Sequence, residues 1–258
     1  VLVPGVLCAP VLMMAQGSMA PFLGAVPYGM DGVGIALVIG LLVVCLGIHE
    51  AAHAWVAYKC GDSTAKDLGR ITVNPIVHID PVLTIIVPLM LYLSPTGFLF
   101  GGAKPVPVNY HRLRSPLRDM MLVALAGPVS NFLLAALFAL ALRVVGEFGL
   151  YEPDQMMGVI LRQAVLLNLS LAAFNMLPIP PLDGSRVMAW ILPESLRPGF
   201  VAIERFGLLL VLGAILLPGV RDVTTNIIMS SINAMAEFIY WFLDPVLALL
   251  HTLVGIVA

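Results

Sequence analysis

Residues 33–58, VGIALVIGLLVVCLGIHEAAHAWVAY, decide how this chain folds. An uncharged run opens the stretch, and the polar motif His-Glu-Ala-Ala-His at 49–53 continues it without a proline. Because a bilayer is crossed by about 20 mainly apolar residues in a helix, the stretch predicts a membrane-spanning helix. Ionisable side chains are costly inside such a span, so the motif near its far end marks a functional site.

The spacing of His49 and His53 places both imidazoles on one face of the predicted helix, about one turn apart. Two histidines in that position hold one zinc ion, and Glu50 between them lies beside the metal as a base. The alternative is that two histidines near a helix end are only interfacial polar groups. A glutamate inside an apolar span favours the metal site.

Composition supports a membrane protein throughout the chain. Of its 258 residues 60% are hydrophobic and 11% charged, with a mean hydropathy of +1.01, whereas soluble domains carry about 25% charged residues. A net charge of −2 offers no basic surface for nucleic acid. The three cysteines are widely spaced and predict neither a disulfide framework nor a thiolate metal site.

Further apolar runs follow the first span, at 81–103, 120–142, 156–177, 206–220 and 223–258. Prolines and glycines interrupt the run at 81–103, which we interpret as a re-entrant segment that enters the membrane and returns. The last run is interrupted at Asp244-Pro245. We therefore expect an all-α polytopic membrane protein with about five to six transmembrane helices.

Basic residues orient these spans, because Lys and Arg in short loops favour the cytoplasmic side. The connections at 59–80 and 104–118 are basic, as is the stretch that contains Arg186, Arg197 and Arg205. All three are cytoplasmic if the run at 81–103 is re-entrant. The helix with His49 then runs from outside to inside, and the span at 156–177 delivers Asp183 to the same side.

A catalytic zinc ion usually has three protein ligands and an open position for water. A metzincin would have a third histidine where Lys59 stands, and the next glutamate after Glu50 is as distant as Glu147. Asp183 follows a proline-rich run at the end of a span and is the best remaining candidate. Its alternative is a helix N-cap, for which aspartate is favoured.

Five motifs follow one another along the chain: HEAAH at 49–53, GRITVNP at 69–75, GAKPVPVN at 102–109, AGPVSN at 126–131 and NMLPIPPLDG at 175–184. In this order they resemble the motifs of the site-2 protease family, whose members are intramembrane zinc metalloproteases with a three-helix catalytic core that cleave transmembrane substrates. The resemblance spans about residues 35–190. It implies one Zn²⁺ bound by His49, His53 and Asp183.

The same resemblance suggests how the site works. Glu50 would act as general base and then as general acid. Asn131, which the resemblance places on a core helix facing the zinc, either positions the substrate or its oxyanion, or hydrogen-bonds between helices. The stretch 103–109, kept extended by Pro105 and Pro107, either pairs with an unwound substrate as an added strand or ties the re-entrant segment to the next helix.

We thus expect three regions: an uncharged N-terminal segment at 1–30, a protease core at 31–200 and C-terminal transmembrane helices at 201–258. The expected partners are a transmembrane protein or peptide substrate and the lipid bilayer, with no nucleic acid. The expected location is the plasma (inner) membrane, with the active site toward the cytoplasm. The competing interpretations are a transporter that uses the polar cluster for ion passage and an inactive, chaperone-like relative. The lack of an internal repeat and the intact Glu50 weigh against them.

Overall fold

The computed structural model describes residues 32–86, 89–90, 102–147 and 156–257, and within these ranges the regular elements are helices. Five described helices are long and apolar enough to cross a membrane: Ala36–Lys59, Pro116–Gly146, Met156–Asn175, Arg197–Leu216 and Val220–Leu250. These spans confirm the predicted all-α polytopic membrane fold. Their number lies at the lower end of the predicted range.

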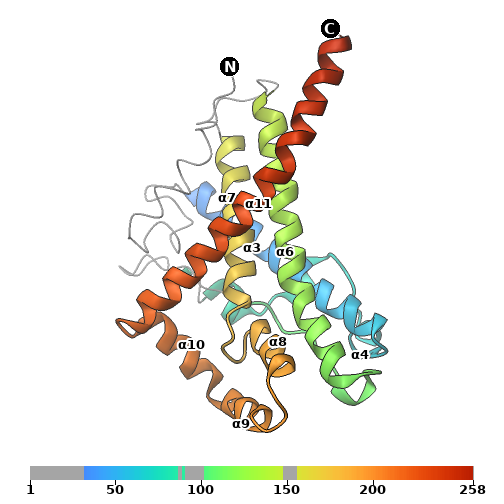
Figure 1. The fold of residues 1–258 in the computed structure, drawn as a ribbon, viewed down its shortest axis with the longest axis vertical. Coiled ribbons are helices and arrows are strands. Elements are labelled where there is room, and N and C mark those ends of the chain that lie inside the picture. Colours follow the sequence, from blue (N-terminus) through green and yellow to red (C-terminus); the bar gives the residue numbers. More distant parts are fainter. Residues whose placement is uncertain (1–31, 87–88, 91–101, 148–155, 258) are drawn as a thin grey trace.

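Three helices form the centre of the molecule: α3 (Gly32–Lys59), α6 (Pro116–Glu147) and α7 (Met156–Asn175). Helix α6 packs along both of the others, as Figure 1 shows. Between α3 and α7, the buried side chains of Leu42, Cys45 and Leu46 pack against Leu167. These are the three helices that the sequence predicts around the polar motifs.

The start of α6 is specified locally. Pro116 is its first residue, where a missing N–H costs nothing. The Asp119 carboxylate accepts the N–H of Ser115 at 2.8 Å, and an acidic group in the first turn also suits the positive end of the helix dipole. The helix then continues through Pro128 to Glu147, so it exceeds the predicted span at both ends.

The chain after α7 forms α8 (Asp183–Ile191), α9 (Arg197–Ala202), the 3₁₀ turn η4 (Ile203–Phe206), α10 (Gly207–Leu216) and α11 (Val220–Val257). The turn between α10 and α11 contains Gly219 at φ +82°, a left-handed conformation that glycine adopts without steric cost. Buried residues of α11, among them Ile232 and Ile239, share one apolar cluster with Ala139 of α6 and Leu169 of α7. The C-terminal helices thus complete the same hydrophobic core.

The interruption expected at Asp244-Pro245 is wrong, because α11 runs unbroken through both residues. Neighbouring helices let membrane helices tolerate proline. Asp244 itself pairs with Arg143 of α6 at 3.1 Å, so a charge that suggested a break in the span instead contacts a neighbouring helix.

Several connections gather at one end of the helix bundle, the lower end in Figure 1. The short helix α4 (Thr64–Asp67), the start of α6, the end of α7, and helices α8 and α9 all lie there. The end of α6, the start of α7 and the C-terminal part of α11 lie at the opposite end. The basic residues of α4, of the start of α6 and of α8 and α9 therefore share one side of the molecule.

The run at 81–103 begins with a π-helical turn, η2 (Pro81–Ile86), and most of the rest lies outside the described residues. Its two described ends meet. Gly102 donates its N–H to the Leu83 carbonyl at 3.0 Å, and the Thr84 hydroxyl donates to the Gly102 carbonyl at 2.6 Å. A chain that returns to its starting point fits a re-entrant segment, but the path itself stays a prediction. The predicted segment at 1–30 also lies outside the described residues.

Candidate metal centre

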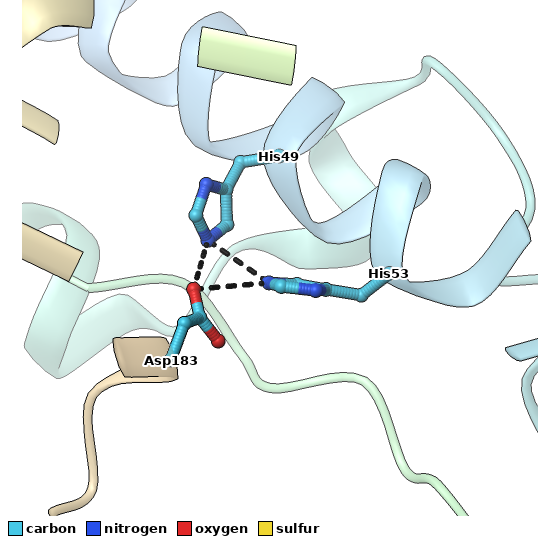
Figure 2. Close-up of side chains that lie close together, drawn as sticks. All are labelled: His49, His53 and Asp183. Carbon is cyan, nitrogen blue, oxygen red and sulfur yellow. Dashed lines mark hydrogen bonds and ion pairs between the residues drawn. The ribbon is translucent and has the colours of Figure 1, made fainter. Parts of the chain in front are cut away.

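The two histidines of α3 meet as their spacing predicts. His49 is 4% exposed and His53 is 7% exposed. Their Nε2 atoms lie 3.0 Å apart, and Figure 2 shows both rings directed at one point.

Asp183 reaches this point from the first residue of α8. Its Oδ2 atom is 3.3 Å from Nε2 of His49 and 3.4 Å from Nε2 of His53 (Figure 2). The N-cap of α8 is Leu182 and not Asp183, so the alternative interpretation of Asp183 as the cap does not hold. The positive end of the α8 dipole also favours a carboxylate at this place.

Hydrogen bonds at the far side of each ring determine where its proton lies. The Nδ1–H of His53 donates to the Val123 carbonyl at 2.7 Å, and the Nδ1–H of His49 donates to Oδ1 of Asn131 at 2.5 Å. A carbonyl oxygen only accepts, so Nδ1 carries the hydrogen in both rings. In the neutral rings both Nε2 atoms therefore present lone pairs to the shared point.

The result is a cluster of three hydrogen-bond acceptors that, among the described residues, has no hydrogen-bond donor between them. The three ligand atoms of His49, His53 and Asp183 all lie within 4.8 Å of one another, and no described residue donates a hydrogen bond to the buried Oδ2 atom of Asp183. Lone pairs in such proximity repel unless a cation lies between them. Zinc sites typically use ligands of this kind, here two imidazole nitrogens and one carboxylate oxygen. The hydrogen bonds at both Nδ1 atoms also fit a zinc site, because they orient the rings.

Gly127 of α6 provides the space for this cluster. A Cβ atom at this position would overlap the rings of both His49 and His53. Only glycine therefore lets α6 approach the two Nε2 atoms so closely. Gly184 has a comparable role after Asp183, because a Cβ there would overlap the carbonyl groups of Met176 and Leu177.

Glu50 lies next to the cluster, and an extended stretch of chain reaches it. Its Oε2 atom accepts the backbone N–H of Val106 at 2.9 Å. The same stretch donates from Lys104 N–H to the His78 carbonyl at 2.8 Å and from Asn109 N–H to Asp62 at 2.6 Å. Residues 103–109 thus run beside the candidate site.

Asp62 fixes the far end of this stretch. It is fully buried, and burial alone would raise the pKa of its carboxyl. Hydrogen bonds from the hydroxyl and N–H of Thr64 and from the N–H of Asn109 outweigh burial and hold the pKa of Asp62 below its ordinary value. The carboxylate is thus a buried anchor for both neighbouring loops.

Asn131 is fully buried and uses both ends of its amide within the helix bundle. Its Oδ1 accepts from His49, and its Nδ2 donates to Oδ1 of Asn168 on α7 at 2.9 Å. Of the two expected roles, the geometry favours hydrogen bonding between helices. The role of Asn131 as a donor to the substrate or its oxyanion stays a prediction.

Sequence reasoning missed several contributors to this site, among them the backbone groups of Val106 and Val123. Asn168 had a usable signal, since it is a polar residue inside an apolar span. Gly127 stands in a quoted motif, but its contact with both rings requires the packing of α6 on α3. The Val106 N–H has no signal at all, because a backbone group is the same in every residue except proline.

Comparisons with known proteins identify similar sequences. The model of Peptidase family M50 matches residues 152–217, which include Asp183. YwhC of Bacillus subtilis is 39% identical over 178 residues, 66% of this chain and 76% of that protein. Rip2 of Mycolicibacterium smegmatis is 29% identical over 223 residues, 84% of this chain and 76% of that protein. Rip2 of Mycobacterium tuberculosis is 30% identical over 193 residues, 74% and 71% respectively. The names of all three describe zinc metalloproteases. No solved structure matches the chain.

Proposed function

Because this chain belongs to peptidase family M50, the site-2 proteases, we propose that it hydrolyses peptide bonds in or near the transmembrane segments of its substrates. It is a zinc metalloendopeptidase of the site-2 type and an integral membrane protein. The acceptor cluster of His49, His53 and Asp183 is the observation that carries the proposal.

The proposed zinc ligands are Nε2 of His49, Nε2 of His53 and a carboxylate oxygen of Asp183. The buried lone pairs that face one another support this assignment. When bound, zinc polarises the scissile carbonyl and lowers the pKa of a coordinated water toward neutrality. Val123 and Asn131 hold the two rings in the tautomer that leaves Nε2 free for this task.

Glu50 is the proposed general base and, later in the reaction, the general acid. The Val106 N–H occupies Oε2, and no hydrogen bond to Oε1 occurs within the described part of the chain. Oε1 would therefore take the proton from the attacking water and return it to the leaving amine. The bond from Val106 would keep the carboxylate from turning while it does so.

The stretch 103–109 is a second proposed element of the site. It donates backbone N–H groups to its own protein at Lys104, Val106 and Asn109, while Pro105 and Pro107 have no N–H to donate. An unwound substrate that pairs with it would therefore mainly donate N–H groups to its carbonyl oxygens. Because the stretch also contacts Glu50, such pairing would place the substrate backbone near the proposed base.

We also propose that the site faces the cytoplasm from the plasma membrane. Basic residues favour the cytoplasmic side, and the connections that carry them lie at one end of the bundle together with α8 (Figure 1). Asp183 is the first residue of α8. The division into a core at 31–200 and C-terminal helices at 201–258 remains part of the proposal.

A Glu50→Gln variant tests the mechanism. Glutamine keeps the acceptor for Val106 and leaves the three proposed ligands in place, so we expect normal zinc content. Cleavage of a labelled single-span substrate in detergent should be abolished, because glutamine cannot take a proton. A zinc chelator should abolish cleavage by the wild-type protein, and His49→Ala should lose zinc as well as activity. Full activity of Glu50→Gln would overturn the assignment of the base.

A further inference from the structure

Two buried asparagines connect His49 to the far helix of the core. Asn131 of α6 and Asn168 of α7 are both 0% exposed. His49 Nδ1–H donates to Asn131 Oδ1 at 2.5 Å, and Asn131 Nδ2 donates to Asn168 Oδ1 at 2.9 Å. The three side chains form a chain of hydrogen bonds across α3, α6 and α7.

The direction in which these hydrogen bonds are donated decides whether His49 can bind a metal ion. An asparagine amide has a donor end and an acceptor end of almost equal shape. If Asn131 turned over, its NH₂ group would face Nδ1 of His49, and the ring would carry its hydrogen on Nε2. A protonated Nε2 has no lone pair to offer a metal ion.

Asn168, the last of the three hydrogen-bonded side chains, sets this direction. Nδ2 of Asn168 lies 2.8 Å from the carbonyl oxygen of Ala164 and 3.1 Å from Sγ of Cys45. The Ala164 oxygen can only accept, so the amide nitrogen of Asn168 must face it. Oδ1 of Asn168 then faces Asn131 and requires its NH₂ group.

We infer that Asn168 is a positioning residue for the metal centre, which keeps the His49 lone pair directed at the metal through Asn131. The inference rests on the proposed zinc site. His53 needs no such relay, because the Val123 carbonyl fixes its tautomer directly. The orientation of His53 therefore depends on α6 alone, whereas that of His49 depends on both α6 and α7.

Removal of the Asn168 amide should weaken zinc binding without any loss of a ligand. Asn131 would lose its partner on α7 and would be able to turn over, which favours the wrong tautomer of His49. Partners of metal ligands typically change metal affinity by about 10–100-fold when they are removed. We expect a loss in that range for Asn168→Leu, which has a similar size and no hydrogen-bonding group.

The experiment measures zinc affinity by chelator competition on the full chain in detergent. Ser170→Ala is the matched control, since the hydrogen bond of the Ser170 hydroxyl within the described residues goes to the Leu166 carbonyl of the same helix. Cys45→Ala should change the affinity by less than about threefold, because the Ala164 carbonyl still directs Asn168. Thermal unfolding with saturating zinc shows which variants fold, and Asn168→Ala replaces the leucine variant if that variant does not.

A double-mutant cycle separates positioning from a merely structural role. In an Asn131→Asp background, either carboxylate oxygen accepts from His49 whichever way the group faces. Asn168→Leu should then weaken zinc binding no further. An equal loss in both backgrounds, or no loss in the wild-type background, would overturn the inference. If the His49→Ala and Asp183→Ala variants bound zinc with the affinity of the wild-type protein, the proposed zinc site would itself be wrong.

Discussion

The three central helices α3, α6 and α7 and the C-terminal helices α10 and α11 differ in the polar side chains that they bury. In the first group, His49, His53, Asn131 and Asn168 are buried and joined by hydrogen bonds. In the second group, the residues described as buried are apolar apart from Gly207 and Thr224. A buried polar group is costly unless it is paired. Substitutions near the paired groups of the first group of helices should therefore be more harmful than comparable substitutions in the second group.

The largest difference between the two groups of helices should appear when a glycine in each group is replaced by alanine. Gly127→Ala would overlap both histidine rings, and displacements of about 1 Å in an active site cost on the order of 100-fold in rate. We expect at least that loss of cleavage, together with a loss of zinc. The C-terminal control is Gly213→Ala in α10, where the new Cβ would meet the Leu217 side chain at 3.6 Å, an ordinary van der Waals distance, and no other described residue within 4 Å.

Zinc content and substrate cleavage, measured for both glycine variants, check this prediction. Gly213→Ala should behave as the wild-type protein does. A fully active, zinc-loaded Gly127→Ala would show that the rings are not confined as the structure indicates.

Removal of zinc should lower the thermal stability of every variant that keeps the zinc site, including variants in the C-terminal helices. A ligand present at 1,000 times its Kd stabilises the folded state by about 4 kcal/mol, so chelation should lower the Tm of the wild-type protein and of Gly213→Ala equally. His49→Ala should not respond to the chelator. A Tm of the wild-type protein that is insensitive to chelation would contradict a zinc ion bound between α3 and α8.

Asp62→Asn should cost about 1–3 kcal/mol, because it replaces a buried acceptor of several N–H and O–H groups. The pKa of Asp62 is lowered in the folded state, so its stabilisation is present above the unfolded value of about 3.9 and disappears as the pH falls through the folded value. Unfolding of both proteins at several pH values checks this. The gap between them should be constant near neutral pH and narrow below about pH 4.

The smallest effect should come from the pair of Arg143 and Asp244, which links α6 to α11. The Asp244 side chain is 63% exposed, and exposed ion pairs contribute about 0.2–1 kcal/mol. A double-mutant cycle with Arg143→Ala and Asp244→Ala, followed by thermal unfolding in detergent, measures this coupling. A coupling well above about 1 kcal/mol would contradict the description of this pair as a weak, exposed link between the two groups of helices.

The sequence predicted those features that depend on short-range geometry. The spacing of His49 and His53 determines their shared face in any helix, and the apolar runs predicted the main spans. The arrival of Asp183 at the same end of the helix bundle as His49 and His53 followed from the distribution of basic residues. The break at Asp244-Pro245 was wrong because a proline signal is local, whereas the packing of α11 on its neighbours is not.

The sequence by itself thus determined that this is a membrane protein with a pair of histidines ready for a metal ion. Only the tertiary structure decided which lone pairs face that ion, because the donors and acceptors that orient the rings come from Val123 and Asn131 on α6 and from Asn168 on α7. A hydrogen bond between helices depends on their distance and rotation in space, and a linear sequence contains neither. The same holds for Gly127, whose missing side chain matters only where α6 meets α3.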